Sequence, residues 1–389
     1  MEYLFWTGLA VVLYAYLGYG VLLGLLVKAK RMLFGKKQPP KLSDYPEVTM
    51  VVAAYNEEDF IREKIRNCFE LNYPKDKLKL LFVTDGSTDS TQDIIAQYSD
   101  IMLYHQDGRA GKIAAVNRVM PFVTSPITIY CDANTLLNQD AIVNIVRHYQ
   151  DERVGGVAGE KRIMKLDEDN ASGAGEGFYW RYESTLKKWD SELNSVVGAA
   201  GELFSIRTEL YENVSTAILI EDFYMSLKIA MAGYKFVYEP DAYAVETASV
   251  SVKEELKRKV RISAGGLQAV FMLFPLLNIF KYGMLSFQYV SHRAIRWTLA
   301  PLSLAVLLFT NIWLAMDQGG VYNVLLLGQL LFYSLVTVGW LISNHKIRYK
   351  IFFIPYYFFM MNYSVYLGLL RLLRGKQTVI WEKAERRLS

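Results

Sequence analysis

The sequence predicts an α/β domain with a mostly parallel sheet, placed between membrane segments. Hydrophobic residues make up 52% of the 389 residues, and they gather at the two ends while the charges lie mostly between. From residue 48 to about 240, short apolar runs alternate with amphipathic stretches, a pattern typical of parallel strands covered by helices on both faces. We therefore expect a membrane protein with a folded middle domain.

The N-terminal segment is apolar over residues 3–27 and long enough to cross a bilayer. No basic region precedes it and no small-residue cleavage site follows, which disfavours a signal peptide. Basic residues come directly after it, at Lys28, Lys30, Arg31, Lys36 and Lys37. The positive-inside rule places this flank in the cytosol. We predict a transmembrane helix over 1–30 and a basic linker over 31–45.

The middle domain, predicted over residues 46–252, contains the apolar runs expected of buried strands. Strands are expected at 48–54, 78–83, 101–105, 126–131, 155–159, 196–206 and 235–239. Helices are expected over 56–71, up to Tyr98 and over 111–120, where acidic or hydroxyl side chains begin the first two.

Acidic residues follow several of these strands. Asp132-Ala133-Asn134 comes directly after a buried run, and 55–58 and 85–89 occupy the same position after two other strands. Strand ends in one sheet converge on one crevice, and their oxygens suit a nucleotide with a divalent cation. The alternative for 132–134 alone is an Asx turn, because Asp and Asn are common turn residues.

Other classes of function have little support. The net charge of +4 does not favour nucleic acid, and basic clusters instead lie beside apolar segments, where they meet lipid. Cys68 and Cys131 form no spaced motif and are expected to be reduced core thiols. The histidines show no zinc-ligand spacing; they are His105, His148, His292 and His345.

Four segments, taken in order, resemble motifs of the family 2 glycosyltransferases with a GT-A fold. They are 52–58, 84–89, 132–134 and 220–222. The resemblance covers roughly residues 45–270, and it is closest to the membrane-integrated cellulose, hyaluronan and poly-N-acetylglucosamine synthases. It implies a Rossmann-like GT-A domain that binds a nucleotide-diphospho-sugar, with a UDP-sugar as the expected donor, together with Mg²⁺ or Mn²⁺.

The resemblance also implies donor-site residues. Tyr55 and Glu57 match the segment that lies against the nucleoside, and Asp85 matches the aspartate that recognises the uridine ring. Lys112 and Asn117 match an element near the donor, where a lysine neutralises phosphate as a point charge. The alternative for Lys112 is a solvated lysine in the first turn of a helix.

Asp132 and Asn134 match the metal-binding Asp-x-Asp motif, with its second carboxylate changed to an amide. An amide oxygen still ligates Mg²⁺ or Mn²⁺. Asp222, in Ile-Glu-Asp, matches the catalytic base that takes the proton of the acceptor hydroxyl in inverting transfer. The alternative is that Glu221 and Asp222 only begin a helix, where carboxylates suit the dipole.

The acceptor site is implied by two further segments. Gly198 and Gly201 lie in a glycine-rich stretch that precedes the candidate base Asp222, and Glu221 is the residue next to that base. Arg258 and Arg261, which the resemblance assigns to the donor, align with the Gln-x-x-Arg-Trp motif, whose arginine holds the diphosphate. Arg258 replaces its glutamine, and Ile262, assigned to the acceptor site, replaces its tryptophan. Isoleucine offers a sugar no aromatic face, so single or limited transfer is favoured over a long polymer. A basic lipid-contacting stretch is the other interpretation.

The C-terminal part is predicted as a basic segment with interfacial helices over 253–292, membrane helices over 293–373 and a basic tail over 374–389. We expect 267–290 to lie at the interface, since it adjoins the basic stretch and carries Lys281. The membrane side of the tail stays open, because 267–290 could instead span or the last apolar segment could form a hairpin. A Trp-x-Lys-x-x-Arg-like run at 381–386 suits an interfacial anchor.

Together these features predict an inverting glycosyltransferase in a bacterial inner membrane with a cytosolic catalytic domain. Its expected partners are a nucleotide-sugar donor, a glycan or lipid-linked acceptor and membrane lipids, with no nucleic acid. One alternative is a polyprenyl-phosphate sugar synthase, whose acceptor phosphate needs less help from a base. The other is a catalytically silent transporter or scaffold, against which the membrane segments lack the charges typical of solute pathways.

Overall fold

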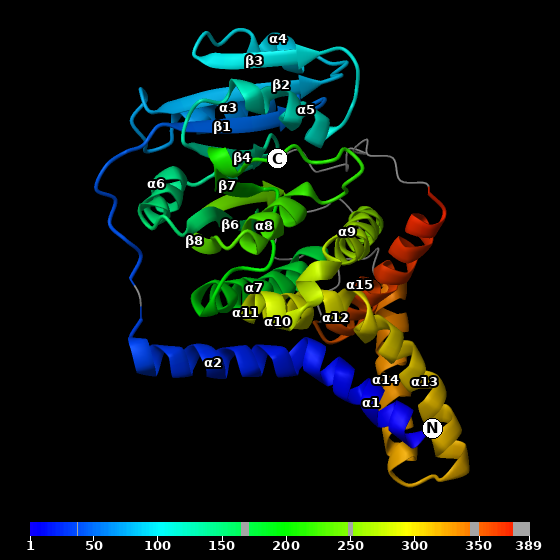
Figure 1. The fold of residues 1–389 in the computed structure, drawn as a ribbon. Helices are drawn as coiled ribbons and strands as arrows, with labels where there is room; N and C mark the ends of the chain where they lie inside the picture. The colour runs from blue at the N-terminus through cyan, green and yellow to red at the C-terminus, as the bar shows by residue number, and fades with distance from the viewer. Residues whose placement is uncertain (37, 165–170, 248–251, 343–349, 376–389) are drawn as a thin grey trace.

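The computed structural model describes residues 1–36, 38–164, 171–247, 252–342 and 350–375. Figure 1 shows the sheet domain above a set of helices that leads down to a hairpin of two long helices. Those two helices are α13 (Leu299–Asp317) and α14 (Val321–Leu341). The predicted anchor at 381–386 lies outside the described residues.

The sheet has eight strands in the order β3-β2-β1-β4-β7-β6-β8-β5. The strands are β1 (Val48–Ala54), β2 (Leu78–Asp85), β3 (Ile101–Gln106), β4 (Ile127–Asp132), β5 (Thr135–Leu137), β6 (Val154–Met164), β7 (Leu203–Arg207) and β8 (Lys235–Thr247). The β3-β2-β1-β4 half is entirely parallel, and β6 pairs with β8 in parallel. The pairs β4–β7, β6–β7 and β5–β8 are antiparallel. The predicted α/β fold with a mostly parallel sheet is confirmed.

Helices cover both faces of the sheet. One face packs against α3 (Ile61–Phe69), α4 (Thr91–Ile95) and α6 (Ala141–Val146), and the other packs against α5 (Lys112–Val119) and α8 (Glu221–Met231). Side chains alternate along β1, so that Met50 and Val52 face the first layer while Val51 faces the second. Short 3-10 turns lie at Met120–Phe122, Arg147–Gln150 and Thr208–Leu210.

Two predicted elements are shorter than expected. The helix expected from residue 56 begins only at Ile61, because residues 56–60 form a loop with Asn56 in the left-handed region (φ 53°). The strand expected over 196–206 is confined to β7, whose first residue is Leu203. In both cases the residues that leave the regular element lie beside the cavity described below.

A helical layer lies beneath the sheet. It contains α7 (Ala171–Leu193), α9 (Val252–Met272), α10 (Ile279–Tyr282), α11 (Met284–Tyr289), α12 (Ile295–Trp297) and α15 (Lys350–Leu373), with a 3-10 turn at Phe274–Leu277 and a π-helical turn, η6, at Val290–Ala294. Residues 267–290 are thus several short helices rather than one continuous one. Phe280 of α10 is 98% exposed.

The N-terminal helix is bent. A π-helical turn, η1 (Tyr14–Gly18), separates α1 (Glu2–Leu13) from α2 (Tyr19–Phe34). In Figure 1, α2 runs beneath α7, whereas α1 turns away beside α13. Gly24 permits the close contact with α7, because a Cβ there would lie 3.1 Å from the ring of Trp189. Insertions into the helical ladder commonly cause such bends.

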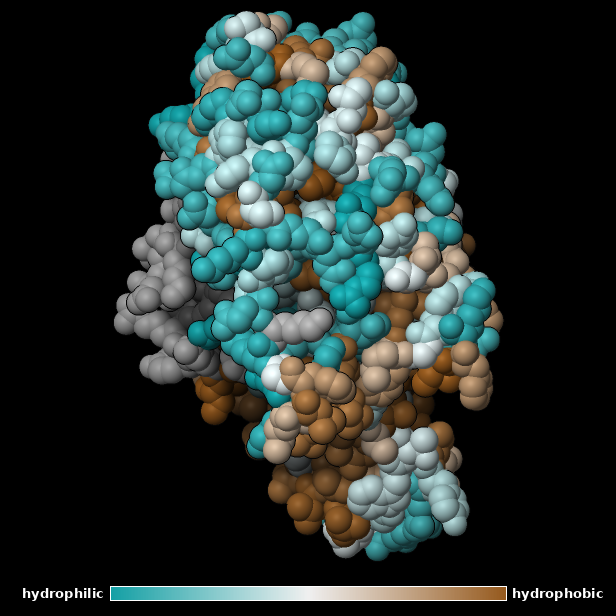
Figure 2. Space-filling view, turned by 60° about the vertical axis from the view of Figure 1, so that its left-hand side comes forward, coloured by the Kyte–Doolittle hydropathy of each residue, from teal (hydrophilic) through white to brown (hydrophobic). Residues whose placement is uncertain are grey.

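Three helices in the described part of the chain are long and apolar enough to cross a membrane: Glu2–Phe34, Leu299–Asp317 and Val321–Leu341. Figure 2 shows a largely hydrophilic upper part and a hydrophobic lower part. This division indicates a membrane protein with a polar domain at one side. The remaining apolar segment forms α15, which packs against α9 and α14.

Candidate functional site

A cavity of about 1470 Å³ begins at the carboxyl ends of β1, β2 and β4 and continues between α7, α9 and α15. Ligands of open α/β sheets commonly bind at this edge. Twelve of the predicted site residues line the cavity: Tyr55, Glu57, Asp85, Lys112, Asp132, Asn134, Gly201, Glu221, Asp222, Arg258, Arg261 and Ile262. The structure therefore brings together side chains that are far apart in the sequence.

The loop after β1 is tied to the loop after β2. The Asn56 side chain accepts a hydrogen bond from the Thr88 backbone N–H at 2.8 Å, and the Glu57 N–H donates to the Thr91 hydroxyl at 2.8 Å. These bonds fix the backbone beside Tyr55, whose ring lies 3.6 Å from the Arg109 guanidinium carbon. A planar aromatic–guanidinium pair of this kind offers a flat wall to a nucleobase.

Asp85 ends β2 and is 5% exposed. Its Oδ2 accepts the N–H groups of Ala110 and Gly111, at 2.9 and 2.6 Å. Its Oδ1 is buried without a hydrogen-bond partner among the described residues, and the Arg118 guanidinium is 3.7 Å away. One oxygen therefore organises the start of α5, and the other is available to accept from a ligand.

Lys112, the first residue of α5, joins two of the predicted motifs. Its Nζ lies 2.6 Å from Oδ1 of Asp132 and 3.4 Å from Oε1 of Glu221. Burial alone would lower the pKa of Lys112, but these two carboxylates outweigh it and raise that pKa above its usual value. The alternative of a solvated lysine is excluded, since this side chain is an enclosed cation between two acids.

Asp222 lies next to this cluster at the start of α8. A Cβ at Gly201 would lie 3.4 Å from Oδ2 of Asp222 and 3.3 Å from Nζ of Lys112, so this glycine lets both groups approach the backbone. Burial, and after it the charge of Glu221, raise the pKa of Asp222 to about 7, against the opposing effect of Lys112. A carboxylate with this pKa can accept a proton near neutral pH.

Asp132 and Asn134 supply oxygen atoms where a divalent cation was predicted. Oδ1 of Asn134 is buried with no hydrogen-bond partner in the described structure, although the residue lines the cavity. No group of three His, Cys, Asp or Glu side chains converges on one point within the described residues. Two protein oxygens fit Mg²⁺ or Mn²⁺ provided that substrate phosphate completes the coordination, as is usual for Mg²⁺.

Helix α9 contributes the basic part of the cavity. Burial lowers the pKa of Arg261, which is close enough to feel the charges of Glu221, Asp132 and Asp222. Arg258 donates from Nε and Nη2 to the Glu255 carboxylate, with both distances 3.0 Å. Both arginines line the cavity and add positive charge opposite the acidic strand ends.

Asn117 and Gly198 do not line the cavity. The Asn117 amide holds a loop, since its Nδ2 donates to the Val214 carbonyl at 2.8 Å and its Oδ1 accepts the Tyr211 hydroxyl at 2.5 Å. Gly198 has φ 90°, and a Cβ there would lie 2.1 Å from the Phe223 ring. Both residues pack outside the cavity wall. The predicted contacts of Asn117 with the donor and of Gly198 with the acceptor stay predictions.

Other cavity residues were not anticipated from the sequence. Trp180 comes from α7, which no motif indicated, and Trp297 comes from α12. Trp297 packs on Gly266, whose Cβ would lie 2.4 Å from the indole, and meets the Phe223 ring at 5.1 Å. Gly266 lies one turn after Ile262 on α9, so Trp297 supplies an aromatic surface close to the position where isoleucine replaces the family's tryptophan.

Glu202, which follows Gly201 in the glycine-rich stretch, forms an ion pair. Its carboxylate lies 2.5 Å from Nζ of Lys161, which also pairs with Glu246. Burial would raise the pKa of Glu202, but Lys161 holds it well below the usual value. Glu202 is therefore a charged wall of the cavity rather than a second proton acceptor.

Residues 49–215 match the family model described as glycosyl transferase family 2. Residues 49–215 are a family 2 glycosyl transferase domain. The family 2 domain contains β1–β7 and the metal-site candidates, whereas Asp222, β8 and α9 follow it in the chain.

The curated proteins similar to this chain include two synthases. One is the poly-beta-1,6-N-acetyl-D-glucosamine synthase of Staphylococcus aureus strain MSSA476, 25% identical over 254 residues, which are 63% of this chain and 60% of that protein. The other is the beta-monoglucosyldiacylglycerol synthase of Nostoc sp. PCC 7120, 29% identical over 41% of this chain and 34% of that protein. The chain thus spans about 60% of the length of the Staphylococcus relatives.

The solved structures that match this chain include one that covers nearly the whole fold. It is the mannosyltransferase PcManGT from Pyrobaculum calidifontis, solved in complex with GDP-Man and Mn²⁺. The match has a TM-score of 0.71 and 24% identity, and it covers 96% of this chain and 100% of the other. The predicted GT-A fold of the family 2 domain is confirmed.

Proposed function

We infer that this chain is an inverting, metal-dependent glycosyltransferase. It moves a sugar from a nucleoside-diphospho-sugar to an acceptor at the cytosolic membrane face, in polysaccharide or glycoconjugate synthesis. The observation that carries this proposal is the cluster of Lys112, Asp132, Glu221 and Asp222 in one cavity below the Asp85 pocket. The cavity thus combines a nucleoside site, cations that neutralise phosphate and a candidate base.

The donor is recognised at the ends of β1 and β2. The free Oδ1 of Asp85 accepts an N–H of the base, and the Tyr55–Arg109 pair forms a wall of the same pocket. The ring N–H of uracil suits such an acceptor, and so does that of guanine. UDP-sugars are the first donors to test, with GDP-mannose beside them because the Pyrobaculum enzyme was solved with it.

The diphosphate leaves with negative charge, which this site is built to offset. Lys112 and Arg261 place cationic groups beside the acidic strand ends. A Mg²⁺ or Mn²⁺ ion held by Asp132 and Asn134 would supply further Lewis-acid stabilisation of the diphosphate. Asp222 takes the proton of the acceptor hydroxyl as the new glycosidic bond forms on the face opposite the leaving group.

The membrane segments also support this proposal. Basic residues lie at the end of the first apolar helix, where Arg31 pairs with Glu192 of α7 at 2.6 Å, and this charge supports a cytosolic position for the family 2 domain. We assign the chain to a bacterial inner membrane. The three apolar helices then hold the cavity close to the bilayer surface, where a membrane-associated acceptor reaches it.

The test is Asp222→Asn in the full-length protein, assayed with a panel of UDP-sugars and GDP-mannose in the presence of Mn²⁺. We expect turnover to fall by about 10²–10⁴-fold because the base is lost. Nucleotide affinity should be unchanged, since the proposed nucleoside contacts are made by Asp85, Tyr55 and Arg109. Exposed Glu209→Gln is the matched control.

Two outcomes would overturn the proposal. Undiminished turnover by Asp222→Asn would favour direct attack by an acceptor phosphate, as in a polyprenyl-phosphate sugar synthase. Binding of donors without release of UDP or GDP from any of them would favour a silent nucleotide-binding scaffold.

A further inference from the structure

The cavity extends beyond the donor site into a second region, here called the lower arm. It lies between α7, the η6–α12 segment, η1 and α15, and its lining includes Leu17, Trp180, Lys187, Arg293, Arg296 and Phe358. None of these residues belongs to a motif used for the donor. The lower arm therefore needs an explanation of its own.

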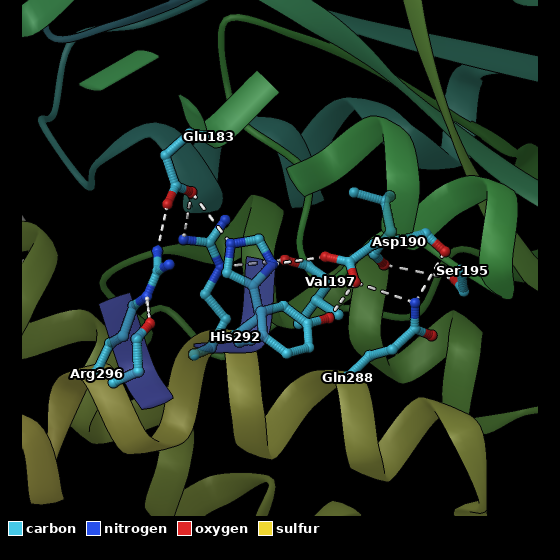
Figure 3. Close-up of polar contacts among 11 residues, drawn as sticks. Glu183, Asp190, Ser195, Val197, Gln288, His292 and Arg296 are labelled. Carbon is cyan, nitrogen blue, oxygen red and sulfur yellow. Dashed lines mark hydrogen bonds and ion pairs between the residues drawn. The ribbon is translucent and has the colours of Figure 1, made fainter. Parts of the chain in front are cut away.

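Two arginines form one wall of the lower arm, and they are held by Glu183 of α7. Figure 3 shows Glu183 facing His292 and Arg296. The Glu183 carboxylate lies 2.5 Å from Nη1 of Arg296 and 3.0 Å from Nη1 of Arg293. The imidazole of His292 bridges onward to Asp190, with 2.5 Å between Nδ1 and Oδ2. One carboxylate thus positions two guanidinium groups at the wall of the lower arm.

Lys187 adds a third cation to this wall. Its side chain is buried, with 4% exposed, and within the described chain no hydrogen bond or ion pair to its ammonium group is formed. Its neighbours are aromatic, because Nζ lies 5.6 Å from the Trp180 ring centre and 5.8 Å from that of Tyr238. A largely buried ammonium that faces the cavity without an acceptor is costly unless a ligand supplies one.

The carboxylates around Lys187 are engaged elsewhere. Glu160 accepts hydrogen bonds from the hydroxyls of Ser184, at 2.6 Å, and Tyr238. Glu202 is paired with Lys161. Burial, and after it the charge of Arg293, lower the pKa of Lys187. The Nη2 of Arg296 is likewise buried without a hydrogen-bond partner among the described residues.

The far end of the lower arm is apolar and open. Leu13, Leu17 and Ile354 line it and are still 49%, 63% and 40% exposed. Phe358 of α15 contacts Tyr16 of η1, with 4.8 Å between ring centres. Leu13 and Leu17 belong to the first helix that is apolar enough to span a membrane, so this end adjoins the bilayer.

We propose that the lower arm binds a phosphate-linked lipid that carries the acceptor sugar. Lys187 and Arg296 donate to its phosphate oxygens, and the hydrocarbon chain leaves between η1 and α15. Charged hydrogen bonds of this kind are strong where water is excluded. This inference rests on the proposed transfer reaction, because it names the class of acceptor for the same cavity.

The test measures binding of farnesyl phosphate, farnesol and inorganic phosphate to the full-length protein in nanodiscs. Farnesyl phosphate should bind about tenfold or more tightly than either of the others, because both the charge and the chain contribute. Lys187→Gln should weaken farnesyl phosphate by about tenfold or more, whereas Lys187→Arg keeps the charge and should restore most of the affinity. Exposed Lys188→Gln is the matched control.

A second variant tests the same inference if Lys187→Gln fails to fold. Leu17→Trp, on the exposed mouth of the lower arm, should weaken farnesyl phosphate without changing UDP or GDP affinity. Farnesyl phosphate that binds Lys187→Gln as tightly as the unmodified protein, or that competes with the nucleotide, would overturn the inference. Lysine-dependent binding without turnover on any donor would instead count against the transferase function and leave the lipid site standing.

Discussion

Asp222 is the residue whose charge state decides whether the site can act. Burial and Glu221 raise its pKa to about 7, and a protonated carboxyl cannot accept the acceptor's proton. We therefore expect kcat/KM to fall about tenfold for each pH unit below 7 and to level off above it. A pH–rate profile with donor in limiting amounts measures this acidic limb.

Glu221→Gln tests whether the acidic limb comes from titration of Asp222 or of another group. Removing the neighbouring negative charge should lower the pKa of Asp222, so the acidic limb should move to lower pH even if the maximal rate also falls. Glu209→Gln, on an exposed turn, should leave the limb in place. A limb that stays at the same pH in Glu221→Gln would show that another group titrates.

Asn134 is the residue at which this chain departs from the usual metal motif. Its unpaired Oδ1 is a neutral ligand, so Asn134→Asp adds one negative charge at the same position. We expect Mn²⁺ to bind about tenfold more tightly, equivalent to about 1.4 kcal/mol. Titration followed by electron paramagnetic resonance, without nucleotide, measures this. Exposed Asn323→Asp is the control, and equal affinities in both variants would place the metal elsewhere.

The contact between α9 and α12 shows how an element shapes the acceptor side of the cavity. Gly265 and Gly266 allow close approach to α9, with Ile220 against the first and Trp297 of α12 against the second. The same indole contacts Phe223, which follows the candidate base in α8. Two glycines in a helix interior are unfavourable by propensity, and their use here is close packing.

Gly266→Ala tests this contact. A Cβ 2.4 Å from the indole would force α12 away, and overpacking of this kind costs about 1–3 kcal/mol. We expect a lower midpoint of thermal unfolding, followed in detergent by tryptophan fluorescence. Gly328→Ala in α14, where a Cβ meets no neighbour within 4 Å, should be neutral. Equal midpoints for the two variants would mean that α12 does not rest on Gly266.

The buried polar network in Figure 3 joins the parts of the whole molecule. Asp190 of α7 accepts hydrogen bonds from Tyr19 of α2 and from Gln288 of α11, and it pairs with His292 of η6. These residues come from the N-terminal helix, the layer beneath the sheet and the segment that leads into α13. The network therefore docks the membrane helices on the family 2 domain.

Asp190→Asn should weaken this docking. Breaking a buried charged pair commonly costs about 3–5 kcal/mol, because the remaining partners keep their desolvation cost. We expect faster amide hydrogen exchange in α2 and α11 than in the strands of the sheet, measured in detergent. Asp317→Asn, exposed after α13, should leave exchange as it is. Uniform exchange across the molecule in Asp190→Asn would instead indicate global unfolding.

At the scale of the whole molecule, the sequence determined the parts that depend on neighbouring residues. Alternating apolar runs gave the positions of β1, β2 and β4, and hydropathy located the helices around 299–317 and 321–341. The acidic residues at the strand ends could then be predicted to lie close together, because parallel strands place their carboxyl ends at one edge of the sheet. Hence the sequence alone predicts Asp85, Asp132 and Asn134 in one cavity.

Only the tertiary structure decided what surrounds those residues. Trp180 and Lys187 reach the cavity from α7, and Trp297 and Arg296 reach it from α12, through contacts between elements that are not neighbours in the sequence. No local pattern records such contacts, because they arise from how helices pack once the sheet has formed. Because of the same packing, Asn117 and Gly198 lie outside the cavity wall. It also brings Lys112 against its two carboxylate partners, Asp132 and Glu221.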